Sequence, residues 1–115
     1  MSDWQDKSKL EINKAVAEID PRFESCVDVE FFANDENDQA VDVVSQGVFI
    51  CTVDYFYNPS DAWPIILESK IAIEPIVCFG DLWQANIKHH KEVCGNPLRA
   101  AMIVYLEMNG VKPNE

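Results

Sequence analysis

The sequence predicts a single α+β domain, residues 1–115, in which an antiparallel sheet of about four or five strands packs against three helices. Two observations carry this prediction. Three segments begin with helix-capping residues and continue with apolar residues at helical spacing. Between them lie short runs rich in β-branched residues, which are typical of strands. A chain of 115 residues is the size of one domain with one hydrophobic core.

The first helix is expected over residues 9–19. Ser8 can cap the amide of Glu11, and the Glu11 side chain can reach back to the Ser8 amide, which makes a capping box. Apolar residues then recur at helical spacing as far as Ile19. Pro21 disfavours a helical conformation for the residue before it, so the helix should end there.

Three strands are expected between the first two helices. Residues 26–32 and 40–44 alternate apolar and polar side chains, and the polar stretch 34–39 between them predicts an acidic hairpin loop. In the first strand, Val27, Val29 and Phe31 should share one face. After Gly47 the apolar run "VFICTV" predicts a further strand.

The second helix is expected over residues 59–69. Asn58 is a good N-cap, and Pro59 suits the first helical position because its missing N–H would be unpaired there. Pro64 lies further inside, where a proline costs about 3 kcal/mol because it cannot donate to the Ser60 carbonyl. We therefore expect the helix to kink, or to pass into a second segment, at Pro64.

The C-terminal part predicts a hairpin followed by a last helix. Two strands should lie within residues 71–88, joined at Gly80-Asp81. A helix over residues 97–109 follows, with a flexible tail at 111–115. Because residues 100–106 are apolar or Tyr throughout, this helix is either the central core helix or part of an oligomer interface, and the latter implies a homodimer through it.

Composition restricts the function classes. The net charge of −11 and pI of about 4.4 argue against direct binding to nucleic acid or an anionic membrane. No apolar run approaches the ~20 residues that span a bilayer. The N-terminus has no export signal, so a cytosolic location is expected.

No motif for a catalytic residue, cofactor or metal was found. The four cysteines, Cys26, Cys51, Cys78 and Cys94, are widely spaced, and the adjacent His89 and His90 cannot easily share one metal ion. No nucleophile or phosphate-loop motif occurs. Loop positions that resemble a calcium-binding loop lack its glycine and its bidentate Glu. Enzymatic activity therefore has no support from a motif.

An acidic surface is the first candidate site. Between Asp20 and Asp54 the only basic residue is Arg22. Such a bias can be a solvated, solubilising face or a surface that meets a basic partner. On an extended strand, Asp28 and Glu30 would lie ~6.8 Å apart on one face, a spacing close to that of successive phosphates. The acidic surface is predicted to comprise Asp28, Glu30, Asp35, Glu36, Asp38 and Asp42.

A second candidate site combines residues from both Asn-Pro helices. Arg99 lies in the first turn of its helix, where a positive charge opposes the helix dipole, and Asp61 could offset it. With Trp63 and Trp83, these residues form either a packing cluster held by an ion pair or a pocket for an anionic group such as a phosphate or a nucleotide.

Three phrases carry a family resemblance: "LEINKAVAE", "YNPSDAWPIILESKIAI" and "NPLRAAMIVYLEMNG". Together they resemble the NinX-like phage protein family of uncharacterised function, and the layout is similar to small phage α/β sandwich domains. The resemblance covers roughly half of the chain, and the acidic segment 27–53 shows no match. It implies a phage or prophage gene product in the cytoplasm of the bacterial host, and it carries over no catalytic residues.

The expected function is that of a small non-enzymatic phage accessory protein, a protein-interaction module that binds a host or phage protein through the flat apolar surface near the last helix or through the acidic hairpin. In the second case the acidic surface would meet a basic or DNA-binding host protein. The alternative is a domain that binds an anionic small molecule, or acts as an enzyme, through the region of Asp61 and Arg99.

Overall fold

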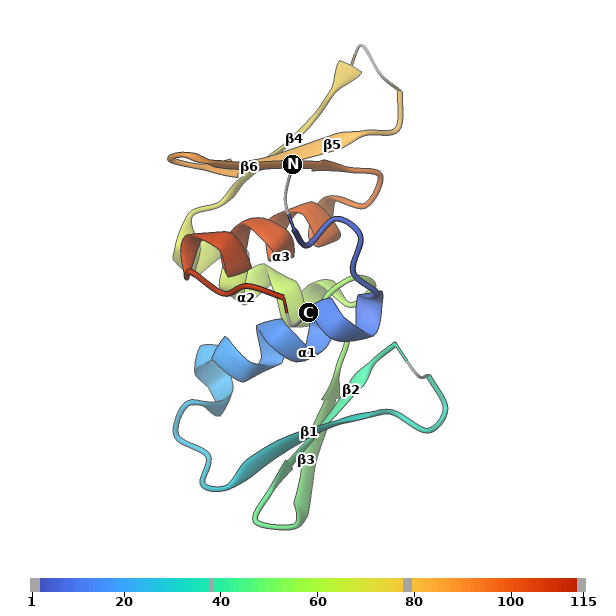
Figure 1. Cartoon of the computed structure of the whole chain (residues 1–115), viewed down its shortest axis with the longest axis vertical. Helices are drawn as coiled ribbons and strands as arrows, with labels where there is room; N and C mark the ends of the chain where they lie inside the picture. The colour runs from blue at the N-terminus through green and yellow to red at the C-terminus, as the bar shows by residue number, and fades with distance from the viewer. Residues whose placement is uncertain (1–2, 38, 78–79, 114–115) are drawn as a thin grey trace.

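A computed structural model of the chain describes residues 3–37, 39–77 and 80–113. Its helices form a middle layer between two sheets, stacked along the 48 Å long axis of the molecule (Figure 1). The described residues form three α-helices: α1 (Lys9–Ile19), α2 (Pro59–Ser69) and α3 (Pro97–Met108). A short 3-10 helix, η1 (Pro21–Phe23), follows α1.

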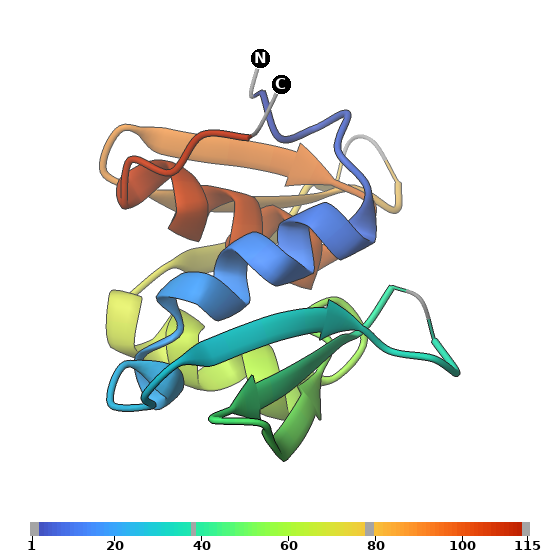
Figure 2. The ribbon, with the colours of Figure 1, turned by 60° about the horizontal axis from the view of Figure 1, so that its bottom comes forward.

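Each sheet has three antiparallel strands in sequence order. Sheet A contains β1 (Val29–Ala33), β2 (Val41–Ser45) and β3 (Val48–Val53), and it precedes α2. Sheet B lies between α2 and α3 in the chain, and it contains β4 (Ala72–Pro75), β5 (Trp83–Ile87) and β6 (His90–Cys94). Figure 2 shows α1 lying between the two sheets.

The α+β class, the single domain and the three helices are confirmed. The strands number six over the described residues and divide between two sheets, because the helical layer separates the two sets of strands. The strand that sequence inspection missed is β6. The turn before it contains Lys88 with φ of 53°, a left-handed conformation that glycine or asparagine usually marks. No such residue signals this turn in the sequence.

Helix α2 continues past Pro64 as one helix from Pro59 to Ser69, so the expected passage into a second segment is wrong. Asn58 caps the start by accepting from the Ser60 amide at 3.2 Å. Pro64 lies on the exposed side, next to a buried face formed by Asp61, Ala62, Ile65 and Ile66. A free carbonyl on that side can bond to water, which limits the cost of the proline.

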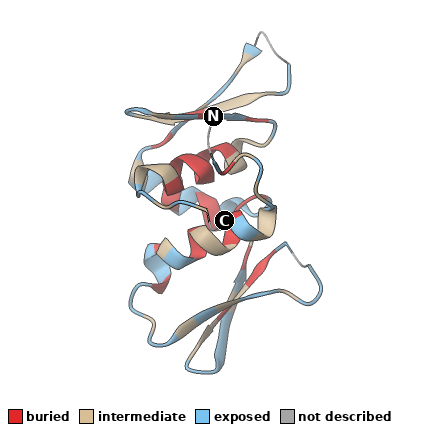
Figure 3. Cartoon of the chain, in the orientation of Figure 1, coloured by how far each residue is buried: buried red, intermediate tan, exposed pale blue. Residues whose placement is uncertain are grey.

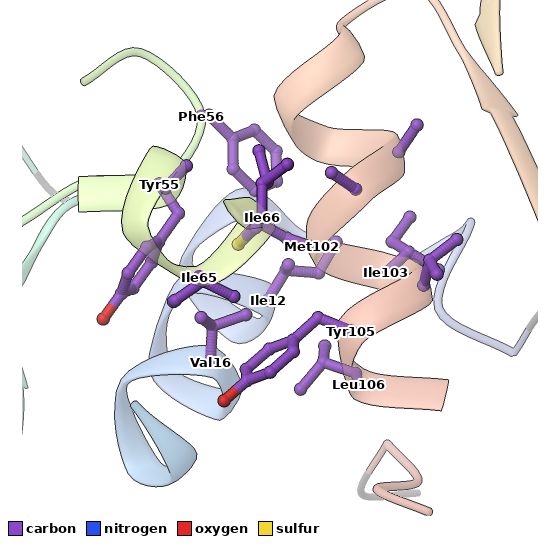
Figure 4. Close-up of a cluster of buried hydrophobic side chains, with 14 of the residues drawn as sticks. Ile12, Val16, Tyr55, Phe56, Ile65, Ile66, Met102, Ile103, Tyr105 and Leu106 are labelled. Carbon is purple, nitrogen blue, oxygen red and sulfur yellow. The ribbon is translucent and has the colours of Figure 1, made fainter. Parts of the chain in front are cut away.

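Helix α3 is the central core helix. Residues 100–106 are all buried, and the side chains of Met102 and Tyr105 meet residues of α1 and α2 (Figure 4). The other side of α3 faces sheet B (Figures 1 and 3). The apolar sequence of α3 is therefore explained within one chain, and we do not propose a dimer through this helix. No helix in the described part of the chain is both long and apolar enough to cross a bilayer.

The two ends of the described chain meet. The Trp4 side chain is buried, and its Nε1 donates a hydrogen bond of 3.0 Å to the Val111 carbonyl. The start of the predicted tail is thus attached to the N-terminal segment, while residues 114–115 lie outside the described residues.

Candidate functional site

Sheet A has an inner face in the core and an outer face on the surface (Figures 1 and 3). Val41, Val43 and Val53 point inward and are buried. The strand register places two cross-strand rows on the opposite, outer face. These rows are Glu30, Val44 and Phe49, and Phe32, Asp42 and Thr52.

A β-bulge decides the position of Phe49. The register shifts between Val43 and Val44, so that Val43 pairs with Cys51 but Val44 pairs with Phe49, and Ile50 has no partner on β2. Without the bulge, Phe49 would lie on the same face as Cys51 and point inward. With it, Phe49 joins Phe32 on the outer face, and their exposed fractions are 59% and 47%.

The acidic side chain of Asp42 is held at the centre of this face. Its Oδ1 accepts hydrogen bonds from Asn34 Nδ2 at 2.7 Å and from Thr52 Oγ1 at 2.6 Å. These two hydrogen bonds lower the pKa of Asp42 below its ordinary value, so the carboxylate stays charged at neutral pH. Glu30 is exposed on the same face.

The other predicted acidic residues lie around sheet A. Asp35 and Glu36 are exposed in the loop between β1 and β2, where Asn34 Oδ1 accepts from the Glu36 amide at 3.0 Å. Asp38 lies outside the described residues. Residues 28–53 contain no lysine or arginine, so no base of this segment neutralises the acids.

The predicted strand position of Asp28 is wrong. β1 begins at Val29, and Asp28 has φ of 49°, so it is not on an extended strand. Val27, expected to share one face of the strand with Val29 and Phe31, precedes the strand and is 57% exposed. The alternation begins only at Val29 and Phe31, and the phosphate-like spacing of Asp28 and Glu30 along one strand is lost.

The second predicted group is not an ion-paired cluster. Asp61 pairs with Arg22, whose Nη1 lies 3.3 Å from Asp61 Oδ1. Arg99 instead donates through Nη2 to the carbonyls of Gln5 at 2.9 Å and Lys7 at 3.0 Å. These carbonyls, rather than a carboxylate, compensate the positive charge of Arg99 at the start of α3. Trp63 is half-exposed on α2, and Trp83 lies on β5 in sheet B.

Sequence inspection missed a partly buried polar cluster next to sheet A. It comprises Asn13, Asp20, Arg22, Asp54, Tyr55 and Asp61, from α1, η1, the β3–α2 connection and α2. The only signal in the sequence was Arg22, a lone base in an acidic segment and two residues from Asp20. A lone charge of this kind is more easily explained by a fixed partner than by solubility.

Tyr55 lies at the centre of the cluster. Its side chain is fully buried, and its hydroxyl donates to Asp20 Oδ2 at 2.7 Å. Burial and the nearby Asp20 carboxylate raise the pKa of Tyr55 far above its ordinary value. The folded protein therefore keeps this phenol neutral.

Tyr55→Phe is expected to make the free energy of unfolding less sensitive to high pH. In the unfolded chain Tyr55 ionises near pH 10, whereas in the folded protein it stays neutral. The contribution of Tyr55 to the free energy of unfolding is therefore complete below pH ~10, and above that pH it falls by about 1.4 kcal/mol per pH unit. The free energy of unfolding can be measured with urea at several pH values between about 9 and 12. It should fall less steeply with pH for Tyr55→Phe than for Tyr57→Phe, the control at an exposed tyrosine. Equal slopes would contradict the neutral, buried state of Tyr55.

The remaining features are a surface hollow, the side chains that could bind a metal ion, and the cysteines. One surface hollow of about 260 Å³ is lined in part by Trp4, Lys14 and Lys112, and its lining includes none of the four residues of the second candidate site. Over residues 3–37, 39–77 and 80–113, no three potential metal ligands gather. Cys78 lies outside these ranges, and burial raises the pKa of Cys51 and Cys94 and keeps these thiols protonated.

The fold and the site define a small α+β protein with a helical layer between two sheets and an acidic, aromatic face on sheet A. A family model described as bacteriophage P22, NinX, matches residues 3–109, and the chain belongs to this family. The match extends across the acidic segment 27–53, which sequence inspection had left outside the resemblance. No curated protein and no solved structure matches the chain significantly.

Proposed function

We propose that this member of the phage family is a non-enzymatic protein-interaction module that works in the cytoplasm of the bacterial host. Its partner is a basic segment of a host or phage protein, which binds the outer face of sheet A. One observation carries the proposal: Phe32 and Phe49 are exposed on that face beside the carboxylates of Glu30 and Asp42.

The two kinds of side chain favour one kind of partner. Exposed phenylalanines supply contact area that becomes favourable when a partner covers it, at roughly 25 cal/mol per Å² of apolar surface. The carboxylates supply attraction for lysine and arginine, which speeds encounter and selects the partner. A partner with basic and apolar side chains in alternation would meet both.

A purely solubilising role explains less of this face. A solubilising role explains the exposed charges. It does not explain why a β-bulge turns Phe49 to the outer face. Bulges often re-aim a side chain at a functional position. The proposed interaction explains the carboxylates and the phenylalanines together.

Affinity capture from phage-infected bacteria tests the proposal. Quantitative mass spectrometry would compare the wild type with Glu30→Gln/Asp42→Asn and with Phe32→Ser. We expect each variant to lose at least roughly tenfold of one captured basic protein, about 1.4 kcal/mol of binding free energy. The capture should also weaken as salt is raised, because screening reduces the charge attraction.

Glu68→Gln/Asp81→Asn is the matched control. It removes the same number of charges from exposed positions on α2 and before β5, away from sheet A. The control should capture the partner as the wild type does. Equal losses in the control and in Glu30→Gln/Asp42→Asn would show that only net charge matters, and unchanged capture by all variants would exclude this face.

A further inference from the structure

The described sheets end in four edge strands, β1, β3, β4 and β6. Edge strands expose unpaired backbone groups, and proteins usually protect them with charges, prolines or covering segments. β1 carries Glu30, and β4 carries Glu74 and ends at Pro75. β6 carries Lys91 and Glu92, and its Val93 carbonyl accepts from Gln5 Nε2 at 3.3 Å.

β3 lacks the charges and prolines that protect the other edges, and its one irregularity is the bulge at Ile50. Residues 48–53 contain neither a charge nor a proline, and residues 43–53 form an unbroken run without a charged side chain. This run occurs in a chain in which 25% of the residues are charged. Three consecutive large apolar residues on β3 are also exposed: Val48 at 62%, Phe49 at 59% and Ile50 at 47%.

We infer that β3 is a self-association edge, which pairs antiparallel with the β3 strand of a second copy of this chain. A two-fold axis places the same surface on both partners, so the surface must be compatible with itself. An acidic edge such as β1 would face its own like charge across such an axis. The uncharged β3 edge would not, and this favours a second copy as the occupant.

The strong overall charge does not prevent this pairing. Neighbouring strands lie about 4.8 Å apart, so the β2 residue Asp42 of one copy would be three strand spacings, about 14 Å, from its equivalent. That separation exceeds the Debye length of about 8 Å at physiological salt, and the repulsion is largely screened. The backbone bonds and the covered side chains of Val48 and Ile50 supply the attraction.

The pair would join two copies of sheet A into one continuous six-stranded sheet. Antiparallel pairing of the same edge requires a two-fold axis perpendicular to the sheet, so the outer faces of both copies would lie on the same side of the joined sheet. The dimer itself requires no ligand on the outer face, so it stands or falls independently of the proposed function.

Sedimentation velocity of the full chain, from low to high micromolar concentration, tests the inference. The wild type is expected to pass from monomer to dimer as concentration rises. Ile50→Lys, which places like charges near the two-fold axis, should raise the dissociation constant by roughly tenfold or more. Val77→Lys is the matched control, because it adds the same charge at an apolar position that is 87% exposed and lies far from β3 in the chain.

The outcomes separate clearly. A dimer that Ile50→Lys weakens and Val77→Lys leaves unchanged supports pairing through β3. A wild type that stays monomeric at all concentrations overturns the inference, as does a dimer that survives Ile50→Lys. Should Ile50→Lys fail to fold by circular dichroism, Val48→Lys at the exposed start of the strand takes its place, with the same expected result.

Discussion

Asn13→Leu is expected to lower the free energy of unfolding by about 3 kcal/mol. The Asn13 side chain is fully buried, and its Oδ1 accepts from the Tyr55 amide at 3.0 Å. Its Nδ2 donates to the Gln39 carbonyl at 2.8 Å and to Asp54 Oδ1 at 3.2 Å. Leucine has a similar volume but leaves these groups without a partner, at a cost of about 1–3 kcal/mol for each buried group.

Urea unfolding followed by circular dichroism measures this loss. Glu18→Leu, at an exposed position of the same helix, is the control, and it should change stability by less than about 0.5 kcal/mol. A small effect of Asn13→Leu would mean that water or a neighbouring side chain replaces the lost hydrogen bonds. The connection between β3 and α2 would then not depend on Asn13.

Arg22→Gln is expected to lower the free energy of unfolding by about 2–3 kcal/mol, the second large effect. Arg22 lies 2.9 Å from Asp20 Oδ2 and 3.3 Å from Asp61 Oδ1, and both carboxylates are almost fully buried. Removing the cation from a buried pair costs about 3–5 kcal/mol because it leaves an uncompensated charge. We expect less here, because the Arg22 side chain is itself 40% exposed.

A double-mutant cycle tests the cause of that loss. Asp61→Asn keeps an oxygen that can accept from the Asp54 amide, which now donates to Asp61 Oδ2 at 3.0 Å. If charge compensation is the cause, Asp61→Asn should cost less in the Arg22→Gln background than in the wild type, by about 1 kcal/mol or more. Additive losses would show that Arg22 does not compensate the charge of Asp61, and would assign the loss to its closer pair with Asp20 or to packing.

The helices could be predicted because their signals are local. Ser8 caps the Glu11 amide at 3.1 Å, and Asn58 and Asn96 accept from the amides that follow them, as the N-cap patterns predict. The Glu11 side chain accepts from the Ser8 hydroxyl at 3.3 Å, and not from the Ser8 amide as the capping box predicted. The apolar run of α3 also predicted its burial correctly as one of two alternatives. Each of these interactions joins residues a few positions apart, so the sequence contains the whole pattern.

The candidate site could be predicted only in part. The acidic bias of residues 28–42 was visible in the composition, but the exposure of Phe32 and Phe49 beside Glu30 and Asp42 depends on strand register and on one bulge. A shift of one residue reverses the face on which a side chain lies, and no local pattern specified it. The same limit explains why Asp28 was placed on a strand that begins one residue later.

The sequence by itself determined the helices, most of the strands, the excess of acid around sheet A and the family. Only the tertiary structure decided that the strands form two sheets on opposite sides of the helices, and that Asp61 pairs with Arg22 while Arg99 binds backbone carbonyls. The physical reason is distance along the chain. Capping and periodicity act over a few residues, whereas Arg22 and Asp61 lie 39 positions apart and meet only when the core forms.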